Sequence, residues 1–60
     1  MNTQGIRERR LALGMTLREL SRQAEINPGR LSIIERGVTP SFDEFQRIES
    51  RLRRAERLAR

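Results

Sequence analysis

Arginine is the side chain in this sequence best suited to chemistry, and it carries all of the positive charge. The chain has 13 arginines and no lysine, histidine or cysteine, against 8 acidic residues, for a net charge of +5. A guanidinium group binds carboxylates and phosphates through two parallel N–H···O bonds. The composition therefore indicates recognition of an anion.

The missing residue types exclude most catalytic and metal-binding sites. Without histidine or cysteine, the chain lacks the usual zinc ligands and the usual base that activates a nucleophile. No disulfide can support the fold, and no apolar run approaches the roughly 20 residues that cross a bilayer. We expect a cytoplasmic, non-enzymatic protein that uses no metal, cofactor or small-molecule ligand and binds no membrane.

The positive charge is concentrated at the C-terminal end. Residues 1–50 hold 8 arginines and 7 acids, which gives +1, whereas residues 51–60, RLRRAERLAR, hold 5 arginines and 1 glutamate, which gives +4. This basic tail could contact phosphate groups. It could equally be a solvated helix end, where arginine suits the negative pole of the helix dipole.

Capping signals in the first half of the chain predict two helices. Residues 5–14 carry apolar residues at helical spacing, and Gly14 is a favourable C-terminal stop. Thr16 and Glu19 have the spacing of a capping box, which predicts that the second helix begins there. The buried face of this helix would consist of Leu17, Leu20 and Ala24.

The second half of the chain predicts two more helices. Asn27 is a favourable N-cap and Pro28 a favourable first residue, and Gly37 would end this third helix. Ser41 begins a fourth helix, and neither glycine nor proline interrupts residues 41–60. With no strand pattern or repeat, the chain is expected to form one all-α domain over residues 1–60.

The second and third helices are separated by a turn of about three residues. Two helices joined in this way form a helix-turn-helix, whose second helix projects its N-terminus into the major groove of DNA. The helix-turn-helix core would cover residues 16–37.

The residues around this core resemble the Cro/cI repressor type of helix-turn-helix, the XRE family. Three segments carry the resemblance over residues 5–52: IRERRLALGMT, LRELSRQAEINPGRLSIIERG and TPSFDEFQRIESRL. The resemblance implies a lambda-repressor-like fold and sequence-specific binding of double-stranded DNA. It also implies a transcriptional repressor, such as those of phages and mobile elements.

The resemblance also implies roles for particular residues. Base contacts are expected at the start of the third helix and one turn later, at Pro28, Gly29, Arg30, Ser32 and Ile33. Phosphate contacts are expected at Thr16, Leu17, Arg18, Arg36 and Thr39. Arg10 and Glu35 are expected to meet as a partly buried ion pair. Arg30 is the strongest hydrogen-bond donor among the base-contact positions, and arginine can bind guanine through two bonds.

The sequence departs from the family pattern at the turn and at the C-terminal end. Glu25 occupies a turn position that relatives often fill with glycine, so a positive φ there would carry strain. The usual fifth helix is missing, and the fourth helix extends instead. The apolar positions of this helix are expected to pack partly in the chain's own core and partly against a second copy of the chain, and Leu52, Ala55 and Ala59 are assigned to the dimer and tail. The resulting homodimer would bind a palindromic operator.

An alternative is a protein-interaction module of the same fold, which binds another regulator or an antitoxin-like partner. The low net charge of residues 1–50 favours it. If Arg18, Arg30 and Arg36 share one surface, binding to nucleoid DNA is favoured. If acids such as Glu25 and Asp43 interrupt that surface, a protein partner is favoured.

Overall fold

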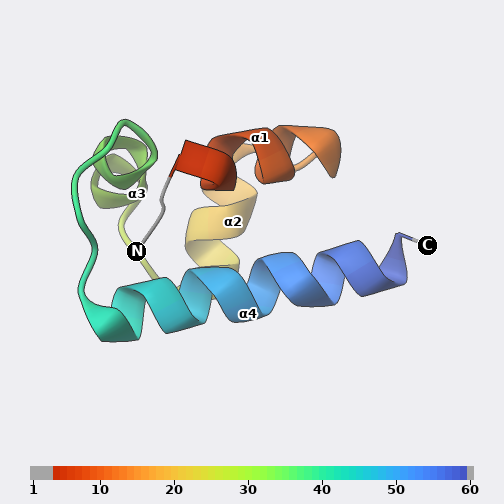
Figure 1. Ribbon diagram of the computed structural model, residues 1–60. Helices are drawn as coiled ribbons and strands as arrows, with labels where there is room; N and C mark the ends of the chain where they lie inside the picture. The colour runs from red at the N-terminus through yellow and green to blue at the C-terminus, as the bar shows by residue number, and fades with distance from the viewer. Residues whose placement is uncertain (1–3, 60) are drawn as a thin grey trace.

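The computed structural model of the chain describes residues 4–59, which form four α-helices (Figure 1). They are α1 (Gln4–Ala12), α2 (Leu17–Ala24), α3 (Pro28–Glu35) and α4 (Phe42–Leu58). Helix α2 lies in the middle of Figure 1, with α1 above it, α3 to the left and the long α4 beneath. Residues 1–3 and Arg60, which the expected domain and tail include, lie outside the described residues.

Side-chain caps begin α3 and α4 where the sequence predicts them. Asn27 Oδ1 accepts the Gly29 backbone N–H at 2.8 Å. Ser41 and Glu44 form a complete capping box: Ser41 Oγ accepts the Glu44 N–H at 3.1 Å, and the Glu44 carboxylate accepts the Ser41 N–H at 2.8 Å. Each cap satisfies backbone donors that a helix leaves unpaired at its start.

The cap of α2 is simpler than the sequence predicts. Thr16 Oγ1 accepts the Glu19 N–H at 3.0 Å. The return bond from the Thr16 N–H to the Glu19 carboxylate, which a full capping box requires, is not formed in the described part of the chain. The helix therefore begins at the predicted residue with half of the predicted box.

Two arginines of α4 complete the C-terminal end of α2. Glu25 has φ +56° and ψ +48°, the left-handed conformation that the turn requires and that costs a non-glycine residue about 1–2 kcal/mol. Arg47 Nη1 donates to the carbonyls of Ala24 and Glu25 at 3.1 and 2.7 Å, and Arg51 Nε donates to the Gln23 carbonyl at 3.1 Å. These bonds stabilise the strained turn because they satisfy the last carbonyls of α2.

The core lies where the four helices meet. It consists of Ile6, Met15, Leu20, Ala24, Ile26, Leu31, Ile34, Ile48 and Leu52, with Leu13, Leu17 and Ala55 packed at its edge. Helix α4 continues without a break to Leu58, so the described residues contain no fifth helix. The expected extension of the fourth helix is confirmed.

Arg9 ties the extended part of α4 to α1. Its Nε and Nη2 donate to the two carboxylate oxygens of Glu56 at 2.9 and 2.8 Å, and its Nη1 donates to Glu49 at 2.8 Å. These hydrogen bonds raise the pKa of the Arg9 guanidinium, and those that Arg9 donates to Glu56 have the largest influence. A network of charges therefore holds α1 against the extended half of α4.

Arg10 joins α1 to the end of α3. Its Nε and Nη2 donate to Glu35 at 2.8 and 3.0 Å, and its Nη1 donates to the Met15 carbonyl at 2.9 Å. The two side chains are only 9% and 4% exposed. Both charges are therefore compensated where water hardly reaches them.

Replacing Arg10 with alanine is expected to lower the free energy of unfolding by about 3–5 kcal/mol, because Glu35 would keep a buried charge without its partner. This loss is comparable to the whole stability that a core of this size supplies. Thermal unfolding followed by circular dichroism, without DNA, measures the effect.

Arg7→Ala is the control, because Arg7 lies on the same helix, is exposed and has no ion pair among the described residues. Its melting temperature should stay close to that of the wild type. An equally small change in both variants would contradict the role given to Arg10.

Candidate nucleic-acid interface

Helix α3 presents a row of side chains to solvent. Leu31 and Ile34 are fully buried on its inner side, and successive residues turn by about 100° around a helix with 3.6 residues per turn. The opposite side therefore carries Gly29, Ser32, Ile33 and Arg36, which we call the α3 row. Gly29 and Arg36 are exposed, and Ser32 and Ile33 are partly exposed.

The first turn of α3 is fixed by its cap. Pro28 occupies the first helical position with its ring exposed, and Gly29 donates its N–H to Asn27. A Cβ atom at position 29 would lie 3.1 Å from Asn27 Oδ1, the oxygen that makes the cap. Glycine therefore leaves the cap room, and the backbone at the start of α3 stays open to an approaching ligand.

Arg30 lies on the flank of α3, between the α3 row and the buried side. Its Nε and Nη2 donate to Glu44 at 3.0 and 2.9 Å, and the two side chains are 36% and 17% exposed. The hydrogen bond with Glu44 raises the pKa of Arg30. Hydrogen bonds from Arg30 and then from the Ser41 backbone lower the pKa of Glu44 to about 2. The residue expected to read bases thus already holds a carboxylate.

The expected phosphate contacts at the start of α2 differ in what they expose. Thr16 is exposed, but its hydroxyl oxygen caps the helix. Leu17 packs at the edge of the core, so only its backbone N–H is available. The Arg18 guanidinium is exposed and makes no hydrogen bond or ion pair in the described part of the chain.

The starts of α2 and α3 share one side of the molecule. Arg18, Arg22, Glu25 and Pro28 are among the residues that line a single open hollow between these helices. Arg36 belongs to the α3 row, and Thr39 follows it as an exposed loop residue. The structure therefore brings Arg18 close to the start of α3. Arg30 faces α4 instead, and one acid, Glu25, interrupts the hollow.

A family model described as helix-turn-helix matches residues 6–58. The chain belongs to the Cro/C1-type helix-turn-helix family, XRE. This is a family of DNA-binding regulatory domains with the lambda-repressor-like all-α fold, so the expected fold is confirmed. No curated protein and no solved structure matches the chain significantly.

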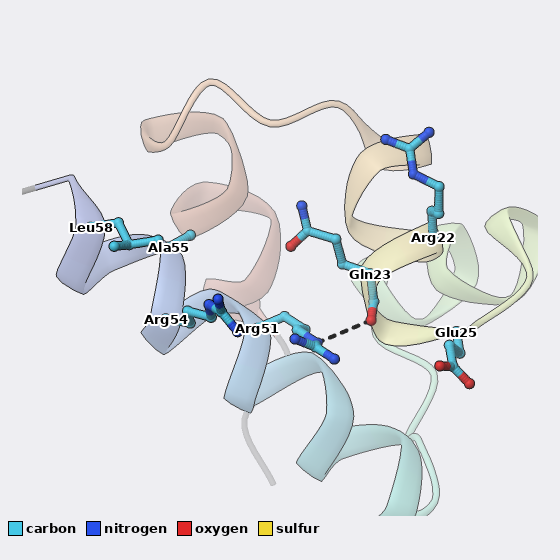
Figure 2. Close-up of a pocket in the computed structure, with 7 residues that line it drawn as sticks. All are labelled: Arg22, Gln23, Glu25, Arg51, Arg54, Ala55 and Leu58. Carbon is cyan, nitrogen blue, oxygen red and sulfur yellow. Dashed lines mark hydrogen bonds between the residues drawn. The ribbon is translucent and has the colours of Figure 1, made fainter.

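This helix-turn-helix domain has a second basic surface, a groove between the C-terminal end of α2 and the second half of α4 (Figure 2). Its lining consists of Arg22, Gln23, Glu25, Arg51, Arg54, Ala55 and Leu58, which we call the α2–α4 groove. Figure 2 shows the Arg51 guanidinium at the Gln23 carbonyl. The Arg22 and Arg54 guanidinium groups have no hydrogen bond or ion pair within the described residues. Sequence reasoning identified the basic tail but missed the groove, because Arg22 comes from another helix.

The apolar positions expected to meet a second copy do not form one surface. Leu52 is 0% exposed and belongs to the chain's own core. Ala55 packs against that core at one side of the α2–α4 groove, and Ala59 is exposed just after α4 ends. Leu52 therefore has no surface left for a partner, and the large exposed apolar side chain of this region is Leu58, at 77%.

Neither a metal-binding cluster nor a membrane-spanning helix is found among residues 4–59. No cluster of three or more carboxylate, histidine or cysteine side chains is placed to hold a metal ion in this range. None of the four helices is long and apolar enough to cross a membrane.

The Arg30–Glu44 pair should be visible in the pH dependence of stability. Glu44 has a folded pKa of about 2, below its ordinary value of 4.5, so the stability it contributes is complete above about pH 4.5 and is lost as the pH falls toward 2. Glu44→Gln keeps the cap, since glutamine also serves in a capping box, but it does not titrate. We expect the melting-temperature difference between wild type and this variant to be constant above pH 4.5 and to shrink between pH 4.5 and 2. A difference that stays constant down to pH 2 would contradict the pairing.

Proposed function

We propose that this chain binds double-stranded DNA sequence-specifically through α3 and acts as a transcriptional repressor by occupying an operator. The observation that supports the proposal is the α3 row, presented from a capped first turn with Arg18 beside it. The major groove, about 12 Å wide, accepts an α-helix and displays a different pattern of polar groups for each base pair. A repressor of this kind would act on the nucleoid DNA of the cytoplasm.

Within this proposal, the start and middle of α3 face the base edges. Pro28 and Gly29 bring the backbone close to the DNA, and the Ser32 hydroxyl can donate to or accept from either kind of base. Ile33 suits the methyl group of thymine. Arg30 lies on the flank of α3 and can use the N–H groups that are not bonded to Glu44. Two of these N–H groups can donate to the two acceptors of a guanine base.

Phosphate contacts would fix the position of the domain without reading sequence. The Leu17 and Arg18 backbone N–H groups at the start of α2 favour an anion, and the exposed Thr16 and Thr39 lie beside the two ends of the helix-turn-helix. The Arg18 and Arg36 guanidinium groups are exposed and have no partner in the described part of the chain. Each such contact makes affinity depend on salt concentration.

We infer that two copies occupy a palindromic operator, with their reading helices about 34 Å apart. Leu58 is exposed at the end of α4, but Arg54 and Arg57 beside it carry unpaired charges in the described part of the chain. Like charges would oppose a symmetric contact in solution. The two copies are therefore proposed to come together only on the operator, each held by its own contacts with the DNA and not by an interface through the second half of α4.

A second candidate function is binding of a protein partner, and the α2–α4 groove favours it. The groove combines the unpaired Arg22 and Arg54 with the exposed Leu58, a pairing of charge and apolar surface that suits an acidic protein segment. Glu44 contacts the first turn of α3, whereas Leu58 follows 14 residues later, about 21 Å along the helix. The Leu58 end of this groove is therefore distinct from the α3 row, whereas Arg22 and Glu25 at its other end also line the hollow beside the start of α3.

Three alanine variants, at Arg30, Arg36 and Arg54, separate these roles when their binding to a duplex selected from random sequences is measured. Arg30→Ala is expected to cost roughly 1–3 kcal/mol on the selected site and to relax the preference for one base pair, because a base contact is lost. Arg36→Ala should weaken selected and random duplexes by the same factor and reduce the slope of log K against log salt by about 0.9. Fluorescence anisotropy at several salt concentrations measures all three.

Arg54→Ala is the control, since it removes an unpaired guanidinium that lies ten residues, about 15 Å along α4, beyond Glu44, which contacts α3. It should leave the salt slope and the base preference unchanged. If Arg54→Ala weakens binding as much as Arg36→Ala does, the duplex contacts α4 and the proposed docking is wrong. If Arg30→Ala weakens every duplex equally, Arg30 is a backbone contact.

A further inference from the structure

Glu44 receives three hydrogen bonds at the start of α4. Its Oε1 accepts from Arg30 Nη2 at 2.9 Å and from the Ser41 backbone N–H at 2.8 Å, and its Oε2 accepts from Arg30 Nε at 3.0 Å. Ser41 in turn caps the helix through the Glu44 N–H. The carboxylate is therefore held from its own helix, and it holds Arg30 of α3 with both oxygens.

This geometry decides which part of Arg30 faces a ligand. A guanidinium has five N–H donors, and Glu44 takes the one on Nε and one on Nη2. Three donors remain, on Nη1 and on the far side of Nη2. They form the edge that can bind two acceptors of a guanine at once.

The pair also changes what Arg30 contributes to binding of random DNA. A free arginine beside the duplex adds a counterion-releasing phosphate contact that strengthens binding to every sequence. Arg30 paired with Glu44 carries no net charge as a unit, and its side chain is already ordered before it meets DNA. Binding then loses less rotamer freedom at this position.

We propose that Glu44 is a positioning residue for Arg30, which holds its free edge toward the bases and keeps its charge from attracting phosphates indiscriminately. Glu44 would thus raise the ratio of specific to random binding without contacting DNA itself. This inference rests on the proposed function, because it requires that α3 reads duplex DNA.

The test compares Glu44→Gln with Asp43→Asn. Each variant removes one negative charge from the first turn of α4, and glutamine preserves the capping box. Asp43 is 80% exposed and contacts Arg47 rather than Arg30, so it is a matched control for charge alone. Affinity is measured for the selected duplex, its single-base variants and a random duplex, each over a range of salt concentrations.

Glu44→Gln is expected to bind the random duplex more tightly than Asp43→Asn does, with a salt slope steeper by up to about 0.9. Its discrimination at the base pair that Arg30 reads should fall on the order of tenfold. In an Arg30→Ala background, Glu44→Gln should add nothing beyond Asp43→Asn. If Glu44→Gln and Asp43→Asn behave alike in the wild-type background, the positioning role is refuted.

Arg30→Lys provides a second variant that leaves the cap of α4 intact. Lysine keeps the charge but cannot form two parallel bonds with a carboxylate. It should show the same loss of discrimination and the same gain in random binding as Glu44→Gln, and unchanged discrimination would overturn the inference.

A wild-type chain that prefers no duplex over random DNA would refute the proposed function itself. A wild-type preference that Glu44→Gln retains would refute only the inference about Glu44.

Discussion

Presentation of α3 depends on the buried pair between Arg10 and Glu35. Helix α3 has eight residues and contributes Leu31 and Ile34 to the core, so packing holds one side of it only. Glu35 ties its C-terminal end to α1, and the same guanidinium binds the Met15 carbonyl between α1 and α2. One side chain therefore fixes α1, the connection to α2 and the end of the reading helix. Removing either charge would leave the other in a site that water hardly reaches.

Several other arginines of this chain also serve the fold. A 60-residue domain buries only about 60% of the surface that its unfolded chain exposes, so apolar packing alone leaves it marginal. Arg9 links α1 to α4, and Arg47 and Arg51 satisfy the last carbonyls of α2. Among the described residues, the arginines whose side chains make no hydrogen bond or ion pair are Arg7, Arg18, Arg22, Arg36, Arg54 and Arg57. The net charge of +5 therefore says little about which arginines are free to bind DNA.

Sequence reasoning succeeded where a short stretch of chain decides the structure. The caps at Asn27 and Ser41 and the unbroken α4 follow from local residue types, whereas the positive φ of Glu25 was anticipated only from the glycine that relatives often carry there. It missed the Arg30–Glu44 pair, whose members lie 14 residues apart, and the Arg9 bonds to Glu49 and Glu56, which span 40 and 47 residues. Such contacts depend on the angle at which helices cross, and no local pattern encodes that angle. The sequence therefore predicted Arg30 to be a free hydrogen-bond donor. It also predicted Leu52 to be an interface residue, although Leu52 lies in the core.

The most direct test of DNA reading by α3 is a map of backbone amide chemical shifts in the labelled protein during titration with its selected duplex. We predict the largest changes at the Gly29, Ser32, Ile33 and Arg36 amides and at the start of α2, with the second half of α4 nearly unchanged. Changes confined to the α2–α4 groove, with the amides of the α3 row unmoved, would contradict the account and would place the binding surface on α4.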